Sequence, residues 1–94
     1  MKTNIDMTTA QLVSVVHGQF SRLHKPETII KQLLIDSRKL MAPEGAVFFA
    51  IKGKHHDGHD HVQDLYNRGV RFFVIEHGID EEQFPEATFI SVAS

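Results

Sequence analysis

The sequence predicts an α/β fold: a small mixed sheet that contains a βαβ unit and is flanked by helices. Near-continuous apolar runs fill the segments 46–52 and 70–76, which is typical of strands covered on both faces. Between them, apolar residues recur at helical spacing over 59–68, and Gly69 follows where that helix should stop. Strand, helix and strand in this order predict a parallel pair joined by a right-handed crossover.

A first helix is expected near the N-terminus. Thr8 or Thr9 supplies a hydroxyl that caps free backbone N–H groups, and Gly18 stands where helices commonly stop. The inward face is predicted to carry four apolar residues, Leu12, Val13, Val15 and Val16. A polar connector through Pro26 should follow.

Two more strands are predicted outside the βαβ unit. Apolar and β-branched residues fill 29–35, which ends in the polar turn 36–39. After a turn-rich acidic stretch over 77–85, a last short strand should span 88–92. Because no covering helix follows that strand, we expect residues 1–94 to be one domain of a larger protein.

Composition argues against several classes of function. Ten basic and twelve acidic side chains give a net charge of −2 with no basic block, which argues against nucleic-acid binding. The chain has no cysteine, so disulfides, zinc–thiolate sites and thiol catalysis are excluded. Neither a signal-peptide pattern nor an apolar stretch of ~20 residues is visible, so we expect a cytoplasmic protein without a membrane partner.

The segment 53–61 is rich in potential metal ligands, because it holds four histidines and two aspartates. A metallohydrolase pattern H-x-H-x-D-H that ends at His61 is met by His56 but fails at Gly58. A His59-Asp60 dyad would need partners elsewhere, for which His17 and His24 qualify by residue type alone. No complete set of ligands can be assembled, so no metal site is expected, although a metal-dependent hydrolase remains an alternative.

The same segment also approaches a phosphate-binding loop. Gly53 and Gly58 have the spacing of the glycines in G-x-x-x-x-G-K-[ST], but His59-Asp60 replaces the Lys-Ser/Thr pair. Nucleotide hydrolysis and catalytic residues are therefore not expected here. A backbone cradle at a helix start, with Asp57 or Asp60 as cap, still favours anion binding. A solvated turn in a ligand-free interaction domain is the remaining alternative.

Four motifs occur in a specific order: Asp36-Ser37-Arg38, the strand Val47 to Gly53, Asp57-Gly58-His59-Asp60, and the strand Gly69 to Glu76. This ordered set resembles the N-terminal domain of the Mur ligases of the types called MurE and MurF. The segment 36–39 and the Lys52-Gly53 pair look more like MurF. Segment 33–40 and the additional histidines are similar to ligases fused to an alanine racemase. His61 departs from the family, which commonly has an aromatic residue there.

The resemblance implies a function in peptidoglycan synthesis. Mur ligases use ATP and magnesium to join amino acids to a UDP-N-acetylmuramoyl peptide; MurF adds D-alanyl-D-alanine, and MurE adds a diamino acid. The N-terminal domain holds the UDP moiety, while the remaining domains of the same chain bind ATP and the incoming group. The resemblance therefore implies that residues 1–94 bind substrate without catalysing the reaction and without a cofactor of their own.

The resemblance also implies which residues contact UDP. By their positions in the motifs they are Ile35, Ser37, Arg38, Lys54, His55 and His56. Ile35 and Ser37 would line the uridine site, with the Ser37 hydroxyl as a donor. Residues 54–56 would form the second wall. Arg38, with Lys39, would add positive charge toward phosphate, or Arg38 would pair with an acidic neighbour.

Overall fold

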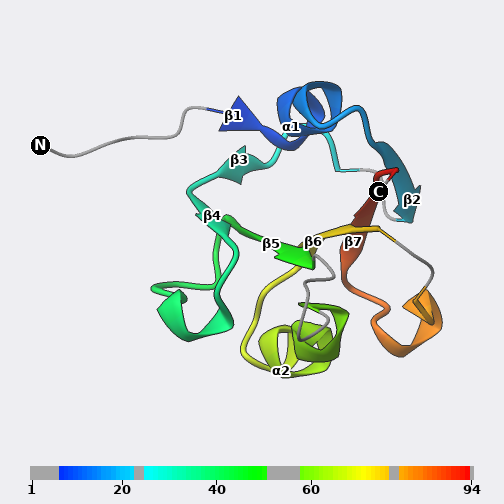
Figure 1. The fold of residues 1–94 in the computed structure, drawn as a ribbon. Coiled ribbons are helices and arrows are strands. Elements are labelled where there is room, and N and C mark those ends of the chain that lie inside the picture. The colour runs from blue at the N-terminus through cyan, green and yellow to red at the C-terminus, as the bar shows by residue number, and fades with distance from the viewer. Residues whose placement is uncertain (1–6, 23–24, 51–57, 77–78, 94) are drawn as a thin grey trace, which may run out of the picture.

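The computed structural model of this chain describes residues 7–22, 25–50, 58–76 and 79–93 (Figure 1). Short helices and strands alternate along these ranges. In chain order they are β1 (Met7–Thr8), α1 (Thr9–Val15), β2 (Gln19–Arg22), β3 (Ile29–Ile30), β4 (Gln32–Leu34), the 3-10 helix η1 (Ser37–Lys39), β5 (Ala46–Ala50), the 3-10 helix η2 (Gly58–His61), α2 (Val62–Asn67), β6 (Phe72–Ile75), the 3-10 helix η3 (Glu81–Gln83) and β7 (Thr88–Ser91).

One five-stranded sheet organises the chain, in the spatial order β2-β7-β6-β5-β4. Strands β4 to β7 run parallel, and β2 pairs antiparallel with β7. Phe48 of β5 lies between Leu34 of β4 and Phe73 of β6, so β5, α2 and β6 form a βαβ unit of neighbouring parallel strands. β1 and β3 form a separate two-stranded sheet. The predicted mixed α/β sheet with a βαβ unit is confirmed.

Helices cover both faces of this sheet, with α1 on one side and α2 on the other (Figure 1). Phe48 and Phe73 pack in one buried cluster with Leu65 of α2. Their neighbours Val47 and Val74 point to the other face and pack in a second cluster with α1. Because successive side chains of a strand alternate between faces, this two-sided burial explains the near-continuous apolar runs.

Helix α1 begins at a capping box. The Thr8 hydroxyl accepts from the Gln11 backbone N–H at 3.2 Å, and the Gln11 side-chain oxygen accepts from the Thr8 N–H at 2.9 Å. Its inward stripe runs through Thr9, Leu12 and the half-buried Val16. The prediction that Val15 points inward is wrong: it is 64% exposed, because it lies beside this stripe on the helical wheel.

The apolar segment 29–35, predicted as a single strand, forms two. β3 pairs with β1, whereas β4 pairs with β5, so the chain changes sheets at Lys31. The N–H groups of Lys31 and Gln32 both donate to the Gly45 carbonyl, at 2.8 and 3.3 Å. Gly45 has a φ of 74°, and a Cβ there would lie 2.8 Å from the Lys31 side chain. This close approach therefore requires glycine.

Strand β2 falls in the segment predicted to be a polar connector. Phe20 lies opposite Ile90 of β7, and the register shifts between Phe20 and Arg22. Phe20 packs against the cluster beneath α1, while Gln19 is exposed. The segment has too few apolar residues to predict a strand by itself. Its strand conformation depends on pairing with β7, about seventy residues later in the chain.

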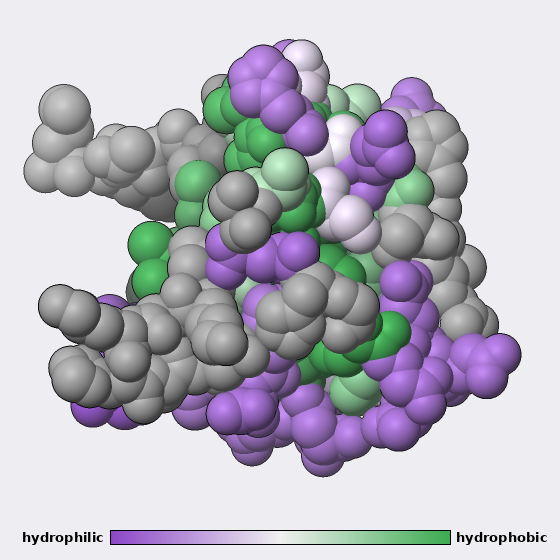
Figure 2. Space-filling view, turned by 45° about the vertical axis from the view of Figure 1, so that its right-hand side comes forward, coloured by the Kyte–Doolittle hydropathy of each residue, from purple (hydrophilic) through white to green (hydrophobic). Residues whose placement is uncertain are grey.

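Polar residues gather on the outside of α2 and η3. Figure 2 shows hydrophilic surface along the lower part of the molecule, where Figure 1 places both elements. The exposed residues there include Gln63, Asp64, Asn67, Arg68, Glu82 and Gln83. None of the helices in the described ranges has the length and apolar character needed to cross a membrane.

Candidate functional site

The carboxyl ends of the parallel strands bring the two predicted substrate segments to one edge of the sheet. β4 and β5 are parallel neighbours, with Leu34 opposite Phe48, so the chain leaves both strands at the same edge. Ile35 to Lys39 follow β4 directly, and the segment 53–61 follows β5. Ligands of open α/β sheets bind at such an edge. Lys54, His55 and His56 lie outside the described residues.

Asp36 and Arg38 form a closed pair at the start of η1. The Asp36 carboxylate accepts from the Arg38 backbone N–H at 3.0 Å, from Nε at 3.0 Å and from Nη2 at 2.8 Å. These bonds hold the pKa of Asp36 well below its usual range and raise that of Arg38. Two roles were predicted for Arg38, and in the structure it pairs with an acidic neighbour, Asp36.

Side chains from elsewhere hold the loop around Ser37 in place. Arg68 at the end of α2 donates to the Ser37 carbonyl at 3.2 Å and to the Asp64 carboxylate at 3.3 Å. The Gln32 amide donates to the Lys39 carbonyl at 3.0 Å, and its oxygen accepts from the N–H of Met41 at 3.3 Å. Sequence reasoning missed Arg68 and Gln32, because both act on backbone atoms and no local pattern marks them.

Beside this braced loop, the two predicted uridine contacts differ in exposure. Ser37 is half-buried at the start of η1, and Ile35 is 72% exposed between β4 and that turn. An isoleucine this exposed at a strand end is available for contact with a flat apolar group such as a base. Ile35 precedes and Ser37 begins the 3-10 turn that Asp36 caps.

The described histidines of the 53–61 segment contact the protein itself. His59 is 8% exposed, and its Nε2 accepts from the backbone N–H of Glu76 at 3.3 Å. The exposed His61 packs edge-on against Phe48, with ring centroids 6.4 Å apart at 85°.

The aspartates and histidines of this segment are also candidate helix caps and metal ligands. Asp60 lies inside η2, and the residue before α2 is His61, which makes no side-chain capping bond, so the capping role predicted for Asp60 is wrong. Asp57 lies outside the described residues. Among the residues that the structure describes, no three His, Asp or Glu side chains come together as a metal site.

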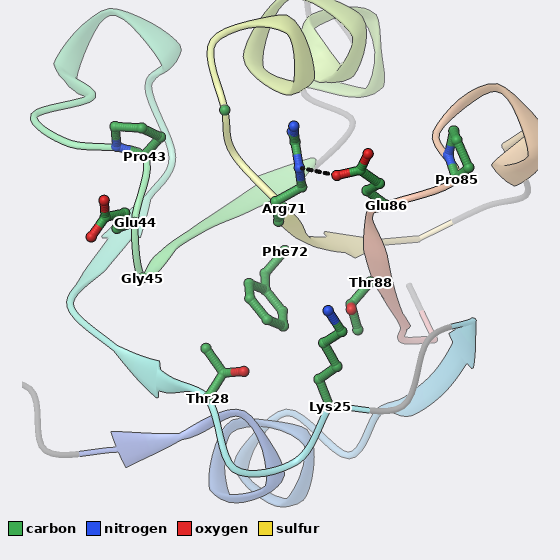
Figure 3. A pocket seen from close by; sticks show the side chains of 11 residues that line it. Lys25, Thr28, Pro43, Glu44, Gly45, Arg71, Phe72, Pro85, Glu86 and Thr88 are labelled. Carbon is green, nitrogen blue, oxygen red and sulfur yellow. Dashed lines mark ion pairs between the residues drawn. The ribbon is translucent and has the colours of Figure 1, made fainter.

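A pocket of about 560 Å³ lies at the opposite edge, beside the amino ends of β5, β6 and β7 (Figure 3). No motif or pattern in the sequence predicts this pocket. Its walls come from segments far apart in the chain, with Phe72 at the centre of the view in Figure 3. The lining residues are Lys25, Thr28, Pro43, Glu44, Gly45, Gly69, Arg71, Phe72, Pro85, Glu86 and Thr88.

The charges of this amino-edge pocket balance one another. Arg71 donates to the carbonyls of Tyr66 and Val70 at 2.9 and 3.0 Å, and its guanidinium carbon lies 4.3 Å from the centre of the Tyr66 ring. Its Nε also lies 3.9 Å from the Glu86 carboxylate. The lining holds two basic residues, Lys25 and Arg71, and two acidic residues, Glu44 and Glu86, so it has no excess positive charge to attract a diphosphate. This pocket therefore lacks the charge that favours a diphosphate, despite its size.

A smaller cavity of about 180 Å³ does lie at the carboxyl edge, on the face that α1 covers. Phe49, Val74 and Val92 give it apolar walls, and Glu76 adds a carboxylate. Glu76 is also the residue whose backbone N–H meets His59. The end of β6 is therefore connected both to this cavity and to the histidine-rich segment.

Comparison with known proteins identifies the family. A family model described as "Mur ligase family, catalytic domain" matches residues 29–93. Crystal structure I of MurF from Acinetobacter baumannii is 31% identical with a TM-score of 0.77, covering 94% of this chain and 18% of that chain. The structure of UDP-N-acetylmuramoylalanyl-D-glutamyl-2,6-diaminopimelate–D-alanyl-D-alanyl ligase from the same organism is 29% identical with a TM-score of 0.80, covering 100% of this chain and 20% of that chain.

The chain thus spans about a fifth of the length of these solved structures. No curated protein sequence matches it. The resemblance to the MurF type that the motifs indicated is confirmed by the solved structures. Because the family model covers more than half of its residues, the chain belongs to the Mur ligase family.

Proposed function

We propose that this chain binds the UDP moiety of a UDP-N-acetylmuramoyl peptide, as the substrate-holding domain of a MurF-type ligase. In the whole enzyme, other domains would use ATP and magnesium to add D-alanyl-D-alanine during peptidoglycan synthesis in the cytoplasm. The two solved MurF structures that the chain resembles favour this dipeptide over the diamino acid that a MurE-type enzyme adds.

The observation that carries the proposal is the shared edge of β4 and β5. Parallel pairing sends the Asp36-Ser37-Arg38 turn and the 53–61 segment out on the same side of the sheet. Two polar segments that leave adjacent parallel strands at their carboxyl ends are near enough for one nucleotide to contact both. The family motifs fall on these two segments.

In this proposal, each predicted residue has a distinct contribution. Ile35 packs against the uracil ring, and the Ser37 hydroxyl donates to the uridine. Lys54, His55 and His56 form the second wall and contact the uridine or the diphosphate. Arg38 contributes by fixing the turn through Asp36, and Lys39 remains as the exposed cation beside it.

Calorimetric titration of the chain with UDP tests this proposal. We expect a dissociation constant between about 1 mM and some tens of micromolar, because one domain supplies only part of the contacts of the whole enzyme. ADP is the matched control, since it carries the same diphosphate on a different base. UDP binding at least about fivefold tighter than ADP supports a uridine site. Equal affinity for both nucleotides, or no heat with UDP at millimolar concentration, contradicts it.

A further inference from the structure

His59 stands apart from the other described histidines because it is buried. It is 8% exposed, whereas His17 and His61 are exposed. It also falls within the Asp57-Gly58-His59-Asp60 motif, yet none of the UDP contacts proposed above uses it. A buried polar ring in a short 3-10 helix needs hydrogen-bond partners inside the protein.

One of its hydrogen-bond partners directly follows the neighbouring strand β6. His59 belongs to η2, which follows β5, and its Nε2 accepts from the backbone N–H of Glu76 at 3.3 Å. Glu76 comes directly after the last residue of β6. The bond therefore crosses from the segment after β5 to the carboxyl end of β6, at the edge that carries the proposed substrate site.

Packing on the following residues holds the same segment on the sheet. Val62, the first residue of α2, is fully buried in the cluster with Phe48 and Phe73. His61 packs edge-on against Phe48. These apolar contacts fix the helix start against one face of the sheet, but a directional bond to the strand end comes from His59.

We propose that His59 is a positioning residue for the substrate site. By accepting the Glu76 N–H, His59 holds η2 at the carboxyl end of β6, and in the proposed function it thereby anchors the wall of the substrate site to which η2 belongs. In the sequence, His59 follows the proposed contact His56 by three residues, a length of chain of about 10 Å at most. His59 itself does not touch the ligand. This inference rests on the proposed function.

The bond specifies the form of the imidazole that does this work. Because Nε2 is the acceptor, the proton of the neutral ring is on Nδ1. A glutamine amide oxygen reaches about as far as Nε2 and can accept the same N–H. A leucine has similar bulk but no acceptor. This pair of substitutions separates the hydrogen bond from the volume of the side chain.

The experiment compares His59→Gln and His59→Leu with the parent chain. A matched structural control is Val70→Ala, which removes fully buried methyl groups near the other end of β6, away from the site. Four quantities are measured for each variant: the thermal midpoint, the UDP affinity by calorimetry, and the NMR shift and exchange rate of the Glu76 amide proton. If His59→Leu does not fold, His59→Asn replaces it, because its side chain is too short to reach Glu76.

We expect His59→Leu to weaken UDP binding about fivefold and to speed exchange of the Glu76 amide. His59→Gln should keep both within about twofold of the parent. Val70→Ala should lower the thermal midpoint at least as much as His59→Leu, yet leave UDP affinity unchanged. If the His59 side chain mattered only for packing, glutamine would not restore the UDP affinity that leucine loses.

Two results overturn the inference. One is UDP affinity of His59→Leu equal to that of the parent, and the other is an equal loss in His59→Leu and Val70→Ala. If the parent itself fails to bind UDP, the proposed function fails separately. In that case an unchanged Glu76 amide in His59→Leu also rejects the anchoring role, and a changed amide retains the anchor while removing its link to UDP.

Discussion

The guanidinium of Arg38 donates hydrogen bonds to both carboxylate oxygens of Asp36, from Nε at 3.0 Å and from Nη2 at 2.8 Å. Asp36 also caps η1 by accepting the Arg38 backbone N–H. Arg38 thus supplies both the backbone N–H that the Asp36 cap binds and the positive charge that balances the Asp36 carboxylate. The arginine of this motif acts first on the shape of the loop, which presents Ser37 at the edge of the sheet.

This pair predicts a specific dependence of stability on pH. Hydrogen bonds from Arg38 lower the pKa of Asp36 in the folded chain, so the unfolded chain takes up this proton first as pH falls. The contribution of Asp36 to the free energy of unfolding is complete above the ordinary aspartate pKa of ~3.9 and is lost as pH falls through the lower folded-state value. Urea unfolding should show that Asp36→Asn is less stable than the parent at neutral pH. The difference between their free energies of unfolding should become smaller in acid.

The control for that experiment is the same substitution in an Arg38→Met background. With the guanidinium gone, the backbone N–H of residue 38 and the charge of Lys39 still favour the ionised carboxylate, but the largest cause of the lowered pKa is lost, so the pH-dependent difference in stability should shrink. If the difference in the free energy of unfolding between the parent and Asp36→Asn is the same at every pH, the pair does not stabilise the folded turn.

The end of α1 predicts a stabilising substitution. His17 has a φ of 56°, and the N–H groups of His17 and Gly18 donate to the carbonyls of Ser14 and Val13 at 3.3 and 2.9 Å. This is a Schellman motif whose left-handed position carries histidine, so the left-handed residue is His17 rather than the predicted stop Gly18. His17→Gly should raise the free energy of unfolding by about 0.5–1 kcal/mol, because glycine adopts positive φ without steric cost.

His17→Ala is the matched control, since it removes the imidazole but keeps a Cβ. It should bring no comparable gain in urea unfolding. Equal stability of the glycine and alanine variants would assign the effect to the exposed imidazole instead of the backbone.

The ring of Phe73 should be among the most costly to remove. Phe73 is fully buried at the centre of the sheet, where it stacks on Phe89 with centroids 5.6 Å apart and meets Phe48 edge-on at 6.5 Å. Phe73→Ala should cost about 3–5 kcal/mol, a large part of the total stability of a domain this small. Val15→Ala, at an exposed position, should change the free energy of unfolding by less than about 0.5 kcal/mol. Similar midpoints for the two variants in urea would contradict the assigned core.

The elements predicted best from sequence are those that a local pattern determines. β5 and β6 are apolar at successive positions because both faces are covered, and Gly69 ends the helix between them with a φ of 103°. β2 was missed because its strand conformation depends on β7. The division of 29–35 was missed because one distant carbonyl, that of Gly45, redirects the chain.

The same distinction holds at the candidate site. The Asp36-Ser37-Arg38 turn was found because its residues are adjacent and its cap is local. The Arg68 bond to the Ser37 carbonyl joins residues 31 positions apart, and the His59 bond to Glu76 joins residues 17 apart. Such contacts depend on the folded topology, which a motif does not encode. The fused racemase stays a prediction.

The most direct test of the central claim asks which edge of the sheet binds UDP. Calorimetric titrations compare Ser37→Ala at the carboxyl edge with Lys25→Ala in the amino-edge pocket, whose side chain reaches toward Phe72 in Figure 3. We predict that Ser37→Ala weakens UDP binding about fivefold, while Lys25→Ala stays within about twofold of the parent. The reverse order, with Lys25→Ala impaired and Ser37→Ala unchanged, would move the substrate to the opposite edge and contradict the account.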